Sequence, residues 1–176
     1  TAMGYNTTAS GNSSTVMGHN TTATAYLSTA MGYQTEASMI ASTAMGYKTT
    51  ASGYKSTAMG SGTTASGHSS TAMGAWNVGG GDSINWVAAD PLFEIGNGAD
   101  ANNRNNALTI YKDGRADFDG SVTATYFIGD GSLLTNTVWS LNANGTGIQV
   151  PTNSASGPYS TAMGDNTTAL GQTSTA

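Results

Sequence analysis

The chain has 176 residues with no cysteine, 24 glycines and only 9% charged residues, so we expect no large apolar core. A formal net charge of −5 without a basic cluster argues against a nucleic-acid partner. No apolar run approaches the roughly 20 residues that a spanning helix needs, so we expect no membrane insertion by this stretch. It begins and ends inside a repeat, which we interpret as a piece of a longer protein.

Residues 1–74 repeat a fourteen-residue unit, for example TAMGYKTTASGYKS at 43–56. Glycine recurs on a seven-residue grid that only Ala25 and Met39 interrupt. A coiled coil also has period seven, but it needs apolar positions on good helix formers, which this grid of glycine, serine and threonine lacks. The repeat therefore predicts a solenoid in which each unit forms two strands, and in which each glycine lets the backbone turn.

The strand STAMG alternates between two faces. Alanine and glycine share one face, which predicts a narrow interior lined by small residues, while threonine and methionine share the other. One methionine per coil then forms a stripe: Met3, Met17, Met31, Met45, Met59 and Met73. Because burial of one methionine contributes roughly 1.5 to 3 kcal/mol, we expect copies of the chain to self-associate through this stripe around a symmetry axis.

The unit STAMGYKTTASGYKS resembles the head repeat of YadA-like trimeric autotransporter adhesins, over residues 1–74 and again in STAMGDNTTALGQTSTA at 160–176. The resemblance implies an all-β fold, a left-handed parallel β-roll that packs as a fibrous homotrimer, with the start of a second head at 160–176. Threonine and methionine stand where the family usually has valine and isoleucine. Ligand contacts of the family are therefore not carried over to any residue.

Residues 75–159 lose the grid and show short alternating strands separated by Gly and Asp-Gly turns. The stretch PLFEIGNGADANNRNNALTIYKDGRADFDGSVTATYFIGDGSLLTN resembles phage tail-fibre-like proteins and surface proteins with an endosialidase-type chaperone. Two arrangements are open for this segment: interleaving with two neighbouring chains, or a small core within one chain. That core would contain Trp76, Trp86, Phe93, Ile95, Leu108, Ile110, Phe118, Phe127 and Trp139.

An aromatic residue often follows the grid glycine. Tyr5, Tyr33 and Tyr47 are predicted to stack with His19 at one turn, and Tyr26 and Tyr54 to lie with Ile40 at the other. We hypothesise that Tyr5, Tyr26, Tyr33, Tyr47 and Tyr54 contact a ligand, since exposed aromatic surfaces suit sugars and proteins alike. The alternative is packing between coils or chains.

His19 and His68 are the only histidines, and they fall in opposite turns. They cannot form a dyad in one chain. Three copies of either histidine around a threefold axis could instead hold a metal ion or an anion, and the alternative is a solvated turn histidine. Apart from this axial ion, no cofactor is expected.

Two threonine ladders raise an ice-binding alternative: Thr7, Thr21, Thr35, Thr49 and Thr63, with Thr8, Thr22, Thr50 and Thr64 beside them. Glu36 interrupts the second ladder, which favours threonine as an ordinary strand former. Asp113, Asp117 and Asp119 lack the spacing of a calcium loop and indicate hairpin turns. GGGDS at 79–83 lacks the lysine of a phosphate loop, and no nucleophile with a base is evident, so we expect no enzyme.

Together with the resemblance to YadA-like head repeats, these patterns predict a non-enzymatic, surface-exposed trimeric fibre, an adhesin that attaches a bacterial cell surface to another surface, a matrix or a glycan. The alternative is a receptor-binding protein like a phage tail fibre, on a virion. A structural spacer or an ice-binding solenoid comes third.

Overall fold

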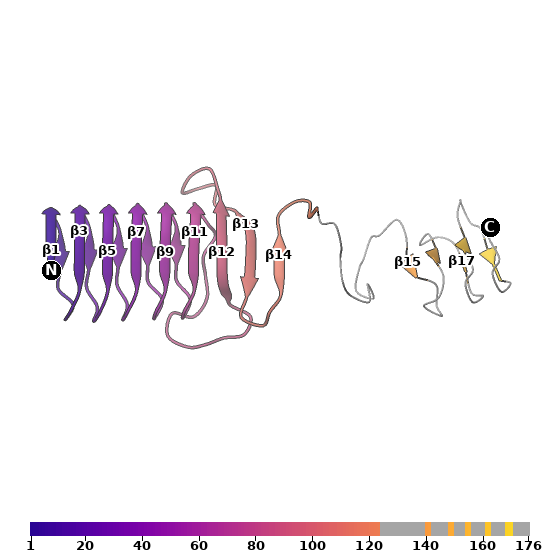
Figure 1. Ribbon diagram of the computed structural model, residues 1–176, viewed down its shortest axis with the longest axis horizontal. Coiled ribbons are helices and arrows are strands. Elements are labelled where there is room, and N and C mark those ends of the chain that lie inside the picture. Colours follow the sequence, from indigo (N-terminus) through magenta and orange to yellow (C-terminus); the bar gives the residue numbers. More distant parts are fainter. Residues whose placement is uncertain (124–139, 142–147, 150–153, 156–160, 163–167, 171–176) are drawn as a thin grey trace. The chain divides into compact units, whose positions relative to one another are not determined.

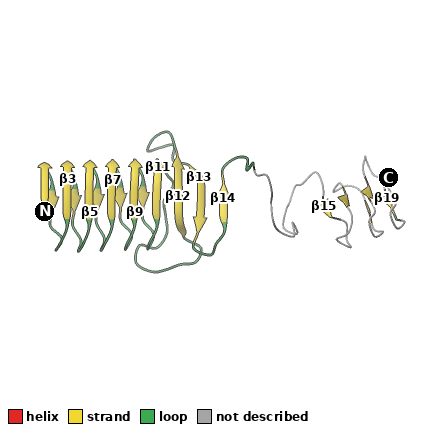
Figure 2. Cartoon of the chain, viewed as in Figure 1, coloured by secondary structure: helices red, strands yellow, loops and turns green. Residues whose placement is uncertain are grey.

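The computed structural model describes residues 1–123 and, beyond them, 140–141, 148–149, 154–155, 161–162 and 168–170. Every regular element in these ranges is a strand (Figure 2), which confirms the all-β prediction. The chain divides into two compact units, Thr1–Thr123 and Ala124–Ala176. Within the described residues, no helix is long and apolar enough to cross a membrane.

The first unit is built on two sheets that face each other across a narrow interior (Figure 1). The longer sheet has the order β1 (Ala2–Tyr5), β3 (Thr15–His19), β5 (Thr29–Tyr33), β7 (Thr43–Tyr47), β9 (Thr57–Ser61), β11 (Thr71–Ala75), β12 (Pro91–Asn97), β13 (Asn106–Tyr111) and β14 (Ala116–Phe118). The shorter sheet consists of two-residue strands, in the order β10 (Thr64–Ala65), β8 (Thr50–Ala51), β6 (Glu36–Ala37), β4 (Thr22–Ala23) and β2 (Thr8–Ala9).

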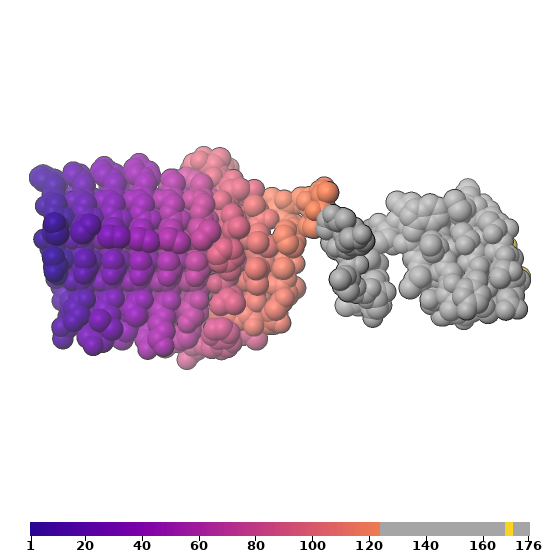
Figure 3. Space-filling view, viewed as in Figure 1, coloured from indigo at the N-terminus to yellow at the C-terminus, as the bar shows by residue number. Residues whose placement is uncertain are grey.

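Each fourteen-residue unit contributes one long and one short strand, and equivalent strands pair in parallel. Met31 of β5, for example, lies opposite Met45 of β7, fourteen residues further along the chain. The predicted parallel β-roll is therefore confirmed. In the space-filling view, side chains of successive coils of this unit line up in rows (Figure 3).

The interior of the roll is as narrow as the alternation predicts. One column of fully buried small side chains follows each sheet: Val16, Ala30, Ala44, Ala58 and Ala72 on the long strands, and Ala23, Ala37, Ala51 and Ala65 on the short ones. Serine and threonine hydroxyls share this interior, and Ser28 Oγ donates to the carbonyl oxygen of Ala25 at 2.6 Å. Small polar residues therefore fit in this interior where bulky ones do not.

The grid glycines are of two kinds: those inside the long strands do not make turns as we expected, whereas those between the strands do, as at Gly53, whose carbonyl accepts from the Ser56 amide at 3.1 Å. Gly46, inside β7, has a φ of 124°, and a Cβ there would overlap the carbonyl oxygen of the next strand glycine, Gly60. The left-handed turn positions are instead occupied by other residues, such as Asn20 (φ 54°) and Lys55 (φ 58°). Ala25 and Met39 interrupt the grid only at its second kind of position, where φ is not positive.

Residues 75–123 extend the long sheet beyond the last coil. β12 pairs in parallel with β11, and β13 and β14 follow as antiparallel strands. A core that contains all the apolar residues predicted for it does not form within one chain, because Trp86 and Phe118 are more than half exposed. Phe127 and Trp139 lie outside the described residues.

The second unit contains short strands that pair in parallel, except for its first two, which pair antiparallel. They are β15 (Ser140–Leu141), β16 (Ile148–Gln149), β17 (Ser154–Ala155), β18 (Thr161–Ala162) and β19 (Thr168–Ala169). Ser154 of β17 lies opposite Thr168 of β19, at the same fourteen-residue offset as in the first unit. β16 pairs with β18 in the same sense, whereas β15 and β16 pair antiparallel.

Candidate functional site

A row of apolar side chains runs along the outer face of the long sheet. The register places Met3 beside Met17, Met17 beside Met31, Met31 beside Met45 and Met45 beside Met59. Ala58 pairs with Ala72, which brings Met59 beside Met73. This confirms that the methionines line one face, at a spacing of about 4.8 Å per strand.

The row continues past the last methionine, which the sequence did not suggest. Met73 pairs with Ile95, Ile95 with Leu108, and Leu108 with Phe118. A neighbouring row changes from threonine to apolar residues at the same place, because Thr71 pairs with Phe93. We call the two together the outer face: Met3, Met17, Met31, Met45, Met59, Met73, Ile95, Leu108 and Phe118, flanked by Phe93 and Ile110.

Within a single chain, the outer face is not covered by any other described element. Met3 is 58% exposed, Met17 42% and Phe118 54%, and the other members are half-buried. An apolar row of this length on a protein with so few charges is typical of an interaction surface.

Aromatic rings stack along one edge of the roll, where the long strands end, as predicted. The ring centroids of Tyr5 and His19 are 4.9 Å apart, those of His19 and Tyr33 5.1 Å, and those of Tyr33 and Tyr47 5.4 Å. The three planes depart from parallel by 18°, 9° and 9°. We call these four residues the first aromatic column; their faces cover one another, so edges and hydroxyl groups remain for contact with solvent.

The opposite turns carry a second column, formed by Tyr26, Ile40, Tyr54, His68 and Trp86. Tyr54 and His68 stack at 5.2 Å, and Trp86 meets His68 edge-on at 6.1 Å. Tyr26 and Ile40 precede them, and both are exposed. The loop between β11 and β12 lies along this edge of the roll, since the amides of Tyr54 and His68 donate to the carbonyls of Ser83 and Asp82 at 2.8 and 2.7 Å.

Asp82 fixes the conformation of that loop. Its carboxylate accepts hydrogen bonds from the backbone amides of Asn85 and Ile84 and from the side chain of Asn85. These bonds lower the pKa of Asp82 to about 2. The loop also encloses Lys112, whose ammonium nitrogen lies 3.7 Å from Asp90 Oδ2 and 5.1 Å from the centre of the Trp86 ring.

The Nδ1 atoms of His19 and His68 are buried, while both residues are partly exposed. The two residues belong to different columns, so one chain does not bring them together. Among the described residues, no three histidine, cysteine, aspartate or glutamate side chains form a metal site. An ion on a symmetry axis stays a prediction.

The threonine ladder that suggested ice binding is not on the surface. Thr21, Thr35, Thr49 and Thr63 are at most 1% exposed and point into the roll. Only the second ladder is accessible, and Glu36 lies in it between Thr22 and Thr50. A flat double row of exposed threonines is therefore absent from the described coils.

A polar network closes the interior at β12. Glu94 pairs with Ala72, so its carboxylate continues the buried alanine column, and it is only 2% exposed. It accepts hydrogen bonds from Asn77 Nδ2 at 2.8 Å, from the Gly79 amide at 3.0 Å and from Asn106 Nδ2 at 2.6 Å. These donors satisfy a carboxylate that would otherwise be costly to bury.

Asn77 also ends the shorter sheet. Its Oδ1 accepts from the Thr64 amide at 2.7 Å, and its Nδ2 donates to the Thr64 carbonyl at 2.9 Å. The side-chain amide thus takes the place that the backbone of a further short strand would fill next to β10. Coil formation stops here because the edge of the shorter sheet is already paired.

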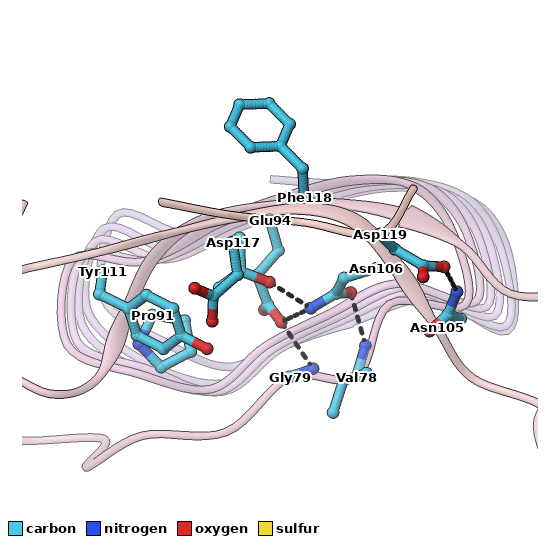
Figure 4. Close-up of a pocket in the computed structure, with 11 residues that line it drawn as sticks. Val78, Gly79, Pro91, Glu94, Asn105, Asn106, Tyr111, Asp117, Phe118 and Asp119 are labelled. Carbon is cyan, nitrogen blue, oxygen red and sulfur yellow. Dashed lines mark hydrogen bonds between the residues drawn. The ribbon is translucent and has the colours of Figure 1, made fainter. Parts of the chain in front are cut away.

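A cavity of about 360 Å³ opens below β12 to β14, next to this network (Figure 4). Its lining includes Glu94, Asn106, Thr109, Tyr111 and Asp117. Phe118 also belongs to the lining, and in the close-up its ring points away from Glu94 and Asn106. The Glu94 carboxylate already accepts hydrogen bonds from groups of the same chain. The cavity therefore offers no evident pair of an acid and a base for catalysis.

The acidic stretch after β13 forms a turn, as predicted. Asp113 accepts a hydrogen bond from the Arg115 amide at 2.9 Å in the hairpin between β13 and β14. Asp119 instead accepts from Asn105 Nδ2 at 2.6 Å, and Asp117 lies 3.7 Å from Arg115 Nε. The three carboxylates are engaged separately and do not converge.

The family model described as YadA head domain repeat (2 copies) matches residues 1–21, 23–49, 37–63, 51–75 and 155–176, just over half of the chain. The match leaves residues 76–154 uncovered, so it gives no support to the resemblance of the middle segment to phage tail-fibre-like proteins. Neither a curated protein nor a solved structure matches the chain.

Proposed function

The chain belongs to the YadA head domain repeat family, and from this premise we propose that it is part of a homotrimeric, non-enzymatic adhesin displayed on a bacterial cell surface. Attachment is then the work of many weak contacts that are repeated along the roll and summed over three chains. The observation that carries the proposal is the continuous outer face, which a single chain leaves uncovered.

Assembly is proposed to bury the outer face of each chain against its neighbours. The long strands supply small side chains to the interior of the roll, so the methionine of each coil is left on the outer face, where assembly can bury it. Packing around a threefold axis covers this area in all copies and leaves no open-ended contact.

The mass in solution tests this proposal. Light scattering after size exclusion should give three times the chain mass of 17.7 kDa. A chain that stays monomeric at high micromolar concentration would contradict it. A second run with a chelator tests the axial ion, because loss of the trimer in chelator would assign a metal to His19 or His68.

Ligand contact is proposed for the tyrosines of the two columns, which would meet a glycan or a protein surface. Since the ring faces in the first column cover one another, Tyr33 and Tyr47 would contact the ligand through ring edges and hydroxyl groups. Lys48 and Lys55 lie 5.2 and 5.0 Å from the centres of the Tyr47 and Tyr54 rings, and they add positive charge beside both columns.

Binding of the trimer to arrays of immobilised glycans and matrix proteins tests this contact. Tyr33→Ala with Tyr47→Ala should lower retention on any surface that the unmodified trimer binds. Tyr111→Ala is a matched control, because Tyr111 lies outside both columns, under the Arg115 guanidinium at 3.9 Å. Equal retention of both variants would remove the columns from the proposal.

A further inference from the structure

We propose that the methionine row of the outer face is a modification site, at which peroxide or hypochlorite converts thioethers to sulfoxides and so weakens assembly. This inference rests on the proposed self-association through that face. It concerns Met3, Met17, Met31, Met45, Met59 and Met73.

Oxidation requires that an oxidant can reach the methionine sulfur atoms. Met3 and Met17 are 58% and 42% exposed, and Met31 to Met73 are half-buried, so oxidants can reach the row in a free chain. In the assembled protein, oxidants would reach the row whenever the copies separate. Oxidation would therefore keep separated chains from assembling again.

The chemistry needs only the oxidant and the side chain. A lone pair on the methionine Sδ attacks one oxygen of hydrogen peroxide, the S–O bond forms as the O–O bond breaks, and water leaves. Sulfur loses two electrons and the peroxide gains them. The product is a polar, chiral sulfoxide, and methionine sulfoxide reductases restore the thioether.

The regular register makes the row sensitive to this change. Because Met31 lies directly opposite Met45 and Met45 opposite Met59, a sulfoxide at Met45 has methionine neighbours on both sides. In a symmetric assembly every copy contributes the same residue at the same height, so one oxidised position places a polar group in each chain. Ile95, Leu108 and Phe118 cannot be oxidised in this way, and they keep one end of the outer face apolar.

Met39 provides an internal reference. It lies in a turn, at a grid position that other coils fill with glycine, and it is not part of the outer face. Oxidation of Met39 should therefore occur without any effect on assembly.

The experiment treats the whole chain with increasing hydrogen peroxide, maps sulfoxides by peptide mass spectrometry and follows the mass in solution by light scattering. We expect the trimer fraction to fall several-fold as the row gains oxygen, and to recover after treatment with reductase. A variant with leucine at all six row positions, which conserves volume, should assemble and resist peroxide. Met39→Leu should respond like the unmodified chain.

The outcomes separate the two proposals. An untreated chain that is monomeric overturns the proposed assembly itself. An untreated trimer that keeps its mass with the row oxidised overturns only this inference. So does a row that stays unmodified while Met39 is oxidised, or a leucine variant that dissociates as readily as the unmodified chain.

Discussion

Met73 of β11 lies in register with Ile95 of β12, where the repeat has already ended. The two side chains belong to one apolar row, although their sequence contexts, TAMGA and FEIGN, share little more than a glycine. The outer face therefore crosses the boundary between the repeats and the segment that follows them. An assembly built on the methionines would include β12 to β14 as well.

A charge placed at Ile95 should prevent assembly. Ile95→Asp puts a carboxylate into the outer face of every copy, and burying an unpaired charge costs several kcal/mol. Light scattering should then report the mass of one chain. Ile84→Asp is the matched control, because Ile84 is 64% exposed in the loop between β11 and β12 and lies off this face. Dissociation of both variants would point to a general effect of the added charge.

Asn77 should be essential for closing the roll. Asn77→Ala leaves the amide and carbonyl of Thr64 without partners and removes one donor from Glu94. Each buried polar group left unsatisfied costs about 1–3 kcal/mol. We expect a lower midpoint in urea denaturation followed by tryptophan fluorescence. Asn97→Ala, at an exposed position at the end of β12, should change the free energy of unfolding by less than about 0.5 kcal/mol.

Alanine should be tolerated far less at Gly46, inside β7, than at Gly67, the turn glycine of the last coil. Gly46→Ala would require a side chain at a φ of 124° and an overlap with the Gly60 carbonyl, so the roll should lose several kcal/mol of stability or fail to fold. At Gly67 φ is not positive, and the nearest atom to a new Cβ is 3.2 Å away. Gly67→Ala should therefore lower the urea midpoint far less. Equal losses would show that the strand glycines are not specially constrained.

The loop between β11 and β12 should loosen in acid. Because its hydrogen bonds lower the pKa of Asp82 from 3.8 to about 2, ionised Asp82 favours the folded loop. This contribution is complete above pH 4 and is lost as the pH falls toward 2. Exchange of the Tyr54 and His68 amide hydrogens, corrected for intrinsic rates, should report the change, since both amides donate to this loop.

Asp82→Ala serves as the test of that assignment. The variant should show weak protection of the two amides at every pH, and the acid dependence should disappear. Asp113→Ala removes a carboxylate from a different turn and should keep the dependence of the unmodified chain. If Asp82→Ala retains the acid transition, another group is responsible for it.

The sequence predicted the parts of the fold that repeat. A fourteen-residue period with alternating small and larger residues is enough to place Ala44 inside, Met45 outside and Tyr33 over Tyr47. The same reasoning failed for Thr35, because propensity puts threonine on solvated faces, while the register here puts it inside; Glu94, also buried, was not singled out. Only the pairing of Glu94 with Ala72, and its amide donors from distant positions, could have identified the closure of the roll.

The left-handed turns beside the first aromatic column change at Gly62. Earlier coils have Asn6, Asn20, Gln34 and Lys48 at this left-handed turn position, and Asn6 Nδ2 donates to Asn20 Oδ1 at 2.7 Å. At Gly62 the ring of Trp76 occupies the space where such a side chain would stand. The Arg104 guanidinium lies 5.3 Å from the centre of that ring and donates to the Gly62 carbonyl at 3.0 Å.

Gly62→Asn should therefore be destabilising, even though it restores the residue of earlier coils. The new side chain would displace Trp76 and, with it, Arg104, so we expect a loss of about 1–3 kcal/mol and a red shift of tryptophan emission as the ring becomes more exposed. Gln34→Asn introduces the same residue into a coil without an overlying tryptophan, and it should be nearly neutral. A Gly62→Asn variant as stable as the unmodified chain, with unchanged emission, would mean that Trp76 has room to move without cost.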